Sequence, residues 1–563
     1  MNKKRFLILV LMFVLLLSLP VFAEGEEEIP NFGWLSVLPP LLAIVLAFVT
    51  KQVLLSLFLG IFIGATMLNG WNPFFGFLRS LDEFIVGSLA DSWNAAIIIF
   101  LLTIGGMVGI INKMGGTTAI AEALSKKVKN PKTAQLFTWI LGCLVFFDDY
   151  ANTLIVGPTM RPLTDKMNVS KEKLSYVIDS TSAPVVGVAL ISTWVGYEIG
   201  VIRSIYQSLG IEANYYQVFL KTIPYNYYCL FSVIFVLMLV LMQRDYGPMY
   251  DAEKRARLTG KVLADDAKPI SSDEITKMEI GKDVKLKVSN AVIPILTLVI
   301  VAFVGLWYNG YTALEGGVDP FSAEGMRACF GEADSSIVLL WASFASSVVA
   351  IIMALAQKIL NMDEVFDAWV DGAKSMSMAC MILVLAWSLG SVTQSVGTAN
   401  FLVGVVSDNI PFGILPIIVF IISGIISFAT GTAWGTMAIV IPLAVPLAQG
   451  FILNSGADPS LVIVTLGTVM SGAIFGDHCS PISDTTIMSS MASGADHLHH
   501  VKTQMPYAVS VGIVSGICYL IAGFTGINPL LILLIGFIIL VGIIRFLGKS
   551  VKEEDLRKEA VNS

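Results

Sequence analysis

A polar stretch interrupts a long apolar region near the C-terminal end of the chain. Residues 475–486 read FGDHCSPISDTT, so two carboxylates, an imidazole, four hydroxyls and a proline stand where lipid-facing sequence carries aliphatic side chains. Charged groups at bilayer depth are costly and mark functional sites by default. A glycine and a proline in one such segment predict a broken helix, whose freed carbonyl groups can build an ion site at the membrane midplane.

Acidic residues at apparent membrane depth are few, and they stand beside Ser, Thr and Asn. Carboxylate, hydroxyl and amide oxygens are the ligands of hard cations, a rule stated for Ca²⁺ and Mg²⁺ that extends by analogy to Na⁺. A zinc site is excluded, because it needs three or four nitrogen or sulfur ligands and this region offers only the pair His478 and Cys479. We predict that Na⁺ or H⁺ binds among Asp148, Asp149, Asn152, Thr153, Asp179, Ser180, Ser182, Asp477, Ser480, Asp484 and Thr485.

The same carboxylates can bind protons, because burial favours the neutral form of an acid. Asp148 and Asp149 are adjacent in sequence, which predicts coupled titration. A buried carboxylate that binds either H⁺ or Na⁺, but not both, can couple the transport of one ion to that of the other. Asp477 has a positional counterpart in Asp179, so we expect Asp477 to be the ion-responsive carboxylate.

Structural roles remain open for several of these residues. An Asp at a helix break can cap the N-terminus of a half-helix, which is the role expected of Asp484 and an alternative for Asp179. His478 is either a proton relay or a hydrogen-bonded structural residue. Glu198 stands near the end of its apolar segment, which favours an interfacial position.

A second polar segment, residues 428–436, holds three threonines and a tryptophan among glycines. Threonine hydroxyls either bond back to helix carbonyl groups or line a cavity, and the glycine-rich context favours a cavity. The tryptophan either gates access to the site or only packs against neighbouring side chains. The residues predicted at this tip are Thr430, Thr432, Trp434 and Thr436.

The composition is that of a polytopic membrane protein. The 563-residue chain is 55% hydrophobic and 14% charged, against roughly 25% charged in soluble domains. Apolar runs of about 20 residues recur, which is the length that spans a bilayer. Six scattered cysteines form no disulfide framework. Segments that can span are 34–50, 53–69, 94–112, 174–200, 226–242, 289–308, 336–357, 376–396, 460–493, 506–524 and 530–547.

Loop charge predicts the orientation, because basic loops stay in the cytoplasm. Residues 133–160 lie between two basic loops and are too short for two spans, so they read as a re-entrant hairpin. The acidic loop 310–335 is extracellular, and residues 412–450 then form a second hairpin that opens to the opposite side. We predict an all-α polytopic membrane protein with about 11 transmembrane helices and two opposed re-entrant hairpins in inverted-topology repeats.

Two cytoplasmic segments complete this organisation. The insert 243–288 reads as a solvated linker, with a regulatory role as the alternative. His497, His499 and His500 are expected in a solvated loop rather than in a pH sensor. The predicted units are a signal peptide at 1–23, scaffold helices at 24–93, repeat one at 94–242, the loop at 243–288, scaffold helices at 289–375, repeat two at 376–547 and a cytoplasmic tail at 548–563.

Three motifs resemble the NhaC-type Na⁺/H⁺ antiporter family: FDDYANT at 147–153, TGTAWGT at 430–436 and, above all, GDHCSPISDTT at 476–486. The resemblance covers residues 34–547. It implies the layout of the ion-transporter superfamily, often as homodimers, and a site between the hairpin tips and the broken spans. The leader and the insert depart from the family core. Similar proteins exchange malate for lactate or carry amino acids, which leaves the substrate open.

We therefore expect a secondary transporter that exchanges Na⁺ for H⁺ across the cytoplasmic membrane by alternating access. The alternative is a Na⁺- or H⁺-coupled carrier of a small organic acid or amino acid, since half-helix N-termini attract carboxylates. No intramembrane Arg or Lys is dedicated to a dianion, and no pore motif or phosphate-binding loop occurs. No enzymatic activity, cofactor or nucleic acid is expected, and the partners are Na⁺, H⁺ and the lipid bilayer.

Overall fold

The computed structural model describes residues 32–50, 52–125, 128–269, 286–314, 319–398, 401 and 411–562. The predicted signal peptide at 1–23 lies outside these residues. Within them the chain is helical apart from two two-residue strands, which confirms the predicted all-α class. Eight helices are long and apolar enough to cross a membrane, and 11 spans result if three bent helix pairs each count as one.

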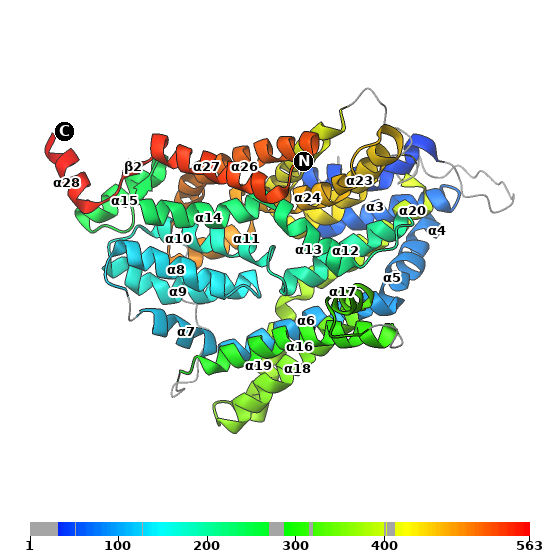
Figure 1. Cartoon of the computed structure of the whole chain (residues 1–563), viewed down its shortest axis with the longest axis horizontal. Coiled ribbons are helices and arrows are strands. Elements are labelled where there is room, and N and C mark those ends of the chain that lie inside the picture. The colour runs from blue at the N-terminus through cyan, green and yellow to red at the C-terminus, as the bar shows by residue number, and fades with distance from the viewer. Residues whose placement is uncertain are drawn as a thin grey trace, which may run out of the picture.

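The part of the chain before the insert at 243–288 is a series of helices (Figure 1). They are η1 (Gly33–Val37), α2 (Leu38–Thr50), α3 (Val53–Leu68), α4 (Pro73–Arg79), η2 (Ser80–Ile85), α5 (Val86–Ala90), α6 (Ser92–Lys113), α7 (Gly116–Ser125), α8 (Pro131–Leu144), α9 (Asp149–Lys166), α10 (Lys171–Thr181), α11 (Ala183–Val186), α12 (Thr193–Ser208), α13 (Tyr215–Thr222), η3 (Ile223–Tyr225) and α14 (Tyr227–Met242).

The insert begins with β1 (Arg244–Asp245) and α15 (Gly247–Thr259), and the helices of the second half follow it. They are α16 (Ser289–Ala313), α17 (Ala323–Glu332), α18 (Ser335–Ala356), α19 (Met362–Ser375), α20 (Ser377–Ser395), η4 (Phe412–Ile414), α22 (Leu415–Thr430), α23 (Ala433–Ser455), α24 (Ser460–Cys479), α25 (Asp484–Ser493), α26 (His497–Thr525) and α27 (Pro529–Leu547), before β2 (Lys549–Ser550) and α28 (Glu553–Asn562).

Two helical hairpins occupy the predicted hairpin segments. In the first, α8 and α9 pack side by side and are joined by the turn 145–148. In the second, α22 and α23 are joined by Gly431 and Thr432. Gly431 has a φ of +71°, and a Cβ there would lie 2.6 Å from the carbonyl oxygen of Ile482, so only glycine fits this turn. In the second hairpin, η4 together with α22 is long enough to span, and so is α23.

Each hairpin is followed by a broken helix, as the proline and polar residues predict. The first breaks at Ser182, between α10 and α11, where φ is −88° and ψ is −98°. The second breaks at residues 480–483, between α24 and α25. A proline stands at each break, Pro184 just after Ser182 and Pro481 within residues 480–483, and has no N–H to continue the helical hydrogen bonds. The first path continues as α12 to Ser208, beyond the predicted end at residue 200.

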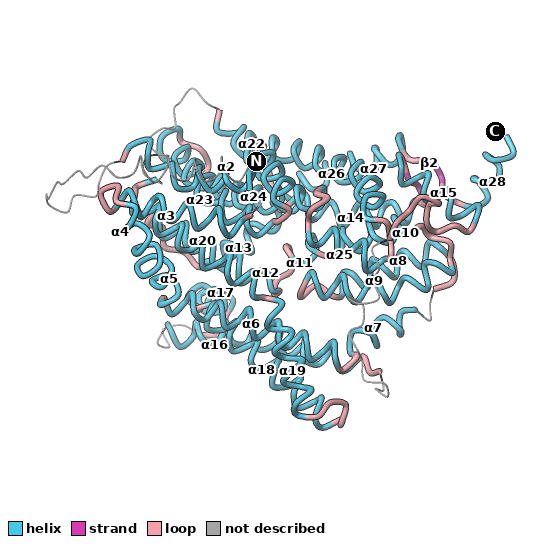
Figure 2. Tube along the Cα trace, turned by 180° about the vertical axis from the view of Figure 1, so that it is seen from behind, coloured by secondary structure: helices cyan, strands magenta, loops and turns pink. Residues whose placement is uncertain are grey.

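The two halves pack across one another. The second helix of the first hairpin, α9, lies against α25, and the second helix of the other hairpin, α23, lies against α12. Figure 2 shows α8, α9, α10 and α25 together. The helices α6, α16, α18 and α19 pack as a separate group at one side of the molecule (Figure 1).

The first part of the insert is packed rather than solvated. Glu253 and Arg257 of α15 are buried, and β1 pairs antiparallel with β2 of the C-terminal segment. Tyr250 of α15 also forms a small hydrophobic cluster with Val551 and Leu556 of the C-terminal segment. The expectation of a solvated linker is therefore wrong for residues 244–259.

Candidate functional site

The first helix break places Asp179 inside the protein. Asp179 stands in the last turn of α10 and is 1% exposed. The Ser182 hydroxyl donates to the carbonyl oxygen of Asp179 over 2.8 Å and thereby satisfies one of the carbonyl groups left open at the helix end. The Asp179 carboxylate is left to interact with other helices.

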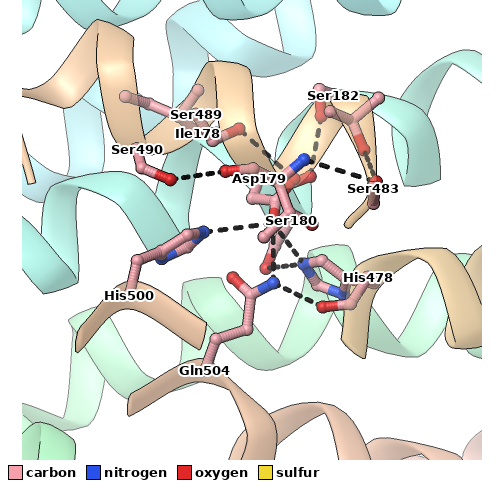
Figure 3. Close-up of polar contacts among 12 residues, drawn as sticks. Ile178, Asp179, Ser180, Ser182, His478, Ser483, Ser489, Ser490, His500 and Gln504 are labelled. Carbon is pink, nitrogen blue, oxygen red and sulfur yellow. Dashed lines mark hydrogen bonds and ion pairs between the residues drawn. The ribbon is translucent and has the colours of Figure 1, made fainter. Parts of the chain in front are cut away.

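Three side chains from the second half of the chain meet this carboxylate (Figure 3). Gln504 Nε2 donates to Asp179 Oδ2 over 2.6 Å, and Ser489 Oγ donates to Oδ1 over 3.2 Å. His500 Nε2 lies 3.3 Å from Oδ2. Gln504 and His500 come from α26 and Ser489 comes from α25. The break of the first repeat is thus held by the helices that follow the break of the second.

His478 joins the same network from the last turn of α24. Its Nε2 lies 3.8 Å from Asp179 Oδ2 and 3.1 Å from Ser180 Oγ. Its Nδ1 lies 2.7 Å from the hydroxyl of Tyr228, and the ring stacks on Tyr176. Two imidazoles and one carboxylate therefore share a buried hydrogen-bonded cluster, within which a proton has several alternative positions.

The second break connects Asp477 to a short chain of hydroxyl groups. Thr485 Oγ1 donates to Asp477 Oδ2 over 2.8 Å, and Ser483 Oγ lies 3.0 Å from Thr485 Oγ1. Ser483 also caps α25 by accepting from the backbone N–H of Thr486. Asp484 is the first residue of α25, so the expected capping role belongs to Ser483 instead. Ser480 Oγ donates to the carbonyl oxygen of Phe428 and ties the break to the second hairpin.

Asn152 connects the first hairpin to the first break. Its amide nitrogen donates to the carbonyl oxygens of Gly142, Val145 and Thr181, at 2.6, 3.1 and 2.9 Å. The first two acceptors lie at the end of α8 and the third ends α10. Thr153 Oγ1 bonds back to the carbonyl oxygen of Asp149 at 3.0 Å. The amide nitrogen of Asn152 therefore acts as a clamp, and the Thr153 hydroxyl as a local helix contact.

A small cavity lies between the two hairpin tips. Its volume is about 40 Å³, enough for a few water molecules or a small cation. Asp148 and Asp149 line it from the first hairpin, and Thr432 and Trp434 line it from the second. The remaining lining residues are Tyr150, Thr193, Ser375, Met376, Met378 and Ile382. Residues of the two predicted hairpin tips, which lie about 280 positions apart in the sequence, are thus brought together.

The polar residues at the tip of the second hairpin have two different roles. Thr430 and Thr436 donate to helix carbonyl groups four residues earlier, over 2.9 Å each, and do not line the cavity. Thr432 lines the cavity and caps α23 through the backbone N–H of Gly435. Trp434 packs between Trp194 and Tyr197 of α12, with ring centroids 5.0 and 4.5 Å away.

Sequence reasoning missed three members of the Asp179 cluster, Ser489, His500 and Gln504. His500 was expected in a solvated loop but is fully buried, and Gln504 is 1% exposed. Their spacing of four residues at the start of a long apolar helix is the signal that identifies one inward face. Glu198 is 1% exposed rather than interfacial.

Comparison with known proteins agrees with this architecture. The model of the Na⁺/H⁺ antiporter family matches residues 27–187 and 185–524. An uncharacterized protein of Haemophilus influenzae is 33% identical over 497 residues, which cover 87% of this chain and 91% of that protein. The malate-2H(+)/Na(+)-lactate antiporter of Bacillus subtilis is 30% identical over 158 residues, 28% of this chain and 32% of that protein.

A solved structure shares the fold. The crystal structure of the YdaH transporter of Alcanivorax borkumensis, described as having an unusual topology, superposes with a TM-score of 0.53 at 12% identity. The match covers 80% of this chain and 90% of that chain. Fold and relatives are those of multi-pass membrane transporters. Because the family model covers most of the chain and the motifs of both repeats, the protein belongs to the Na⁺/H⁺ antiporter family.

Proposed function

We propose that this protein exchanges Na⁺ for H⁺ across the cytoplasmic membrane by alternating access. The observation that carries the proposal is the buried cluster of Asp179 with His478 and His500. A buried carboxylate keeps its charge only beside a compensating partner. That partner is either a protonated imidazole or a bound cation, so the arrival of Na⁺ near this network favours the release of H⁺ from it.

The cation is proposed to enter at the hairpin tips. The cavity there presents the Asp148 and Asp149 side chains with the hydroxyl of Thr432, the oxygen ligands that suit a hard cation. Asp477, together with the nearby hydroxyls of Ser483 and Thr485, offers a second set of such ligands at the second break. Asn152 joins the hairpin to the end of α10, so a change at the tip reaches the helix that carries Asp179.

Alternating access is proposed to follow from the crossed packing of the two halves. The second helix of each hairpin packs against a helix of the opposite half, α9 against α25 and α23 against α12. Movement of one hairpin therefore changes the environment of both breaks. The breaks supply the flexible points, because residues there lie outside the regular helical hydrogen-bond pattern.

The alternative is a coupled carrier of a small organic acid or amino acid, and the partial similarity to a malate/lactate antiporter supports it. The cavity argues against it in this conformation. Its volume of about 40 Å³ is far below the roughly 300 Å³ of small-molecule pockets. No Lys or Arg lies among the lining residues that the structure describes, so an organic anion has no paired charge there.

The two functions are separated by one experiment with the purified chain in liposomes that contain a pH-sensitive dye. Addition of Na⁺ alone is expected to drive proton movement, and this movement is expected to disappear in protein-free liposomes. A protein that stays silent with Na⁺ and responds only after an organic acid or amino acid is added contradicts Na⁺/H⁺ exchange and supports the carrier.

A further inference from the structure

Glu198 is a buried carboxyl group outside the clusters described above. It lies on α12 and is 1% exposed. Neither of its oxygens has a hydrogen-bond partner among the residues that the structure describes. An ionised carboxylate in such surroundings is strongly disfavoured, and the group binds a proton instead.

No charged side chain faces Glu198 in the described part of the chain. The helix α12 packs against α6, α13, α20 and α23, which contribute only Lys113, at the far end of α6, and Lys221, which is exposed. Arg203, on α12 itself, is paired with Asp91 at 2.8 Å. The titratable groups within electrostatic range of Glu198 are Tyr197 beside it and Cys229 on α14.

A polar cleft lies beside the later turns of α12. The cleft has a volume of about 290 Å³ and is lined by Glu83, Asp91, Arg203, Ser204 and Gln207, among others. A smaller pocket shares Ser204 and Trp387 with the cleft and reaches Val201. Val201 is the neighbour of Glu198 one turn along the helix.

The charged pair in this cleft keeps its own charge. Burial raises the pKa of the Asp91 carboxyl, but hydrogen bonds from Arg203 and from the backbone of Asn94 outweigh this effect and hold the pKa below its ordinary value. Asp91 therefore stays ionised with Arg203 and takes no proton in the neutral range.

Glu198 is also connected to the tip of the second hairpin. The hydroxyl of the adjacent residue Tyr197 donates to the carbonyl oxygen of Trp434, and Trp434 lines the cavity between the tips. Trp194, four residues before Glu198 and on the same side of α12, packs on Trp434. Its indole N–H has no partner among the described residues. A movement of the hairpin tip therefore acts directly on the turn that holds Glu198.

The side of the membrane follows from the course of α12. Asn214, just after α12, donates to the carbonyl oxygens of Phe330 and Ala333, which belong to the acidic loop predicted to be extracellular. The helix α10, by contrast, starts at the predicted cytoplasmic side and carries Asp179 inward. Asp179 and Glu198 thus stand on opposite sides of the first break.

We propose that Glu198 is a proton-binding site in the extracellular half of the protein, which takes up the external proton and passes it inward when the second hairpin moves. This proposal rests on the proposed Na⁺/H⁺ exchange, and it adds a proton-carrying group that is separate from the Asp179 cluster. Binding is a simple protonation: the carboxylate gains H⁺ from water on the extracellular side and releases it to water on the cytoplasmic side in the inward-facing state.

The test compares the wild type with Glu198→Gln, which imitates the neutral acid, and Glu198→Asp, which keeps a carboxyl group. Glu212→Gln is the matched control, because it makes the same change at an exposed residue just after α12. Two transport assays in liposomes are used: Na⁺ uptake driven by a pH gradient, and exchange of radioactive Na⁺ for Na⁺ at equal pH. Infrared difference spectra of the purified proteins report the carbonyl stretch of a protonated carboxyl group.

Glu198→Gln is expected to lose pH-driven uptake to the level of protein-free liposomes while keeping Na⁺/Na⁺ exchange and losing one protonated-carboxyl band. Glu198→Asp is expected to keep part of the uptake and to shift that band, and Glu212→Gln to match the wild type. Unchanged pH-driven uptake in Glu198→Gln, or a band that neither Glu198 variant alters, overturns the proposal. A wild type that transports no Na⁺ refutes the proposed exchange, whereas the infrared band still decides whether Glu198 holds a proton.

Discussion

At the residue scale, the polar side chains of this site fall into two kinds that sequence could not separate. Asp179 and His478 face each other across the two repeats, whereas Asn152 and Ser480 donate hydrogen bonds to backbone carbonyl groups. All four are polar residues within apolar segments and look equivalent in the sequence. The difference depends on where distant helices lie, which local sequence does not encode.

Asn152 provides a test at this scale. Replacement by Ala removes the donor from three buried carbonyl groups, and leaving such acceptors unsatisfied is expected to lower the free energy of unfolding by about 1–3 kcal/mol. Thermal unfolding of the purified protein in detergent measures this. Asn152→Asp keeps the shape but removes the N–H donors, so it is expected to destabilise to a similar degree. An unfolding midpoint equal to that of the wild type in both variants contradicts the clamp.

At the scale of elements, the sequence predicted most spans and both breaks because long apolar runs and prolines act locally. The segments expected at 94–112 and 530–547 are α6 and α27, within two residues at each end. The packed position of α15 was not predicted, since its charged residues suggest a solvated helix. Those charges are paired: Glu253 accepts from the backbone N–H and hydroxyl of Ser170, the cap of α10, and from Arg257.

The insert is anchored by a buried ion pair, which gives a test at this scale. Lys173 of α10 donates to Asp245 over 2.5 Å, and Tyr507 donates to the same oxygen. Lys173→Met leaves Asp245 buried without its counter-charge and is expected to destabilise the protein by about 3–5 kcal/mol. The double variant Lys173→Met/Asp245→Asn is expected to recover much of this loss.

Lys374→Met is the matched control, because the pair of Lys374 with Asp371 is exposed and such pairs add little stability. Thermal unfolding in detergent is again the measurement. A Lys173→Met protein as stable as the control shows that the insert is not held by this pair.

At the scale of the whole molecule, the fold brings four segments far apart in the chain to one interior region. The class of fold could be predicted from composition and loop charge, and the family from three motifs. The contact of α26 with Asp179 could not be predicted, because His500 and Gln504 lie more than 320 residues from Asp179 in the chain. Such a cluster exists only when both repeats are folded against each other, so its residues report on the packing of the two halves.

The central claim is that Na⁺ and H⁺ compete for this buried interior. The most direct measurement is calorimetric titration of Na⁺ into the purified protein in two buffers of different ionisation enthalpy, which counts the protons released per Na⁺ bound. We expect the wild type to release protons on binding Na⁺ and Asp179→Asn to release fewer, because the variant removes the charge that both ions share. Na⁺ binding with the same heat in both buffers, and therefore without proton release, would contradict the account.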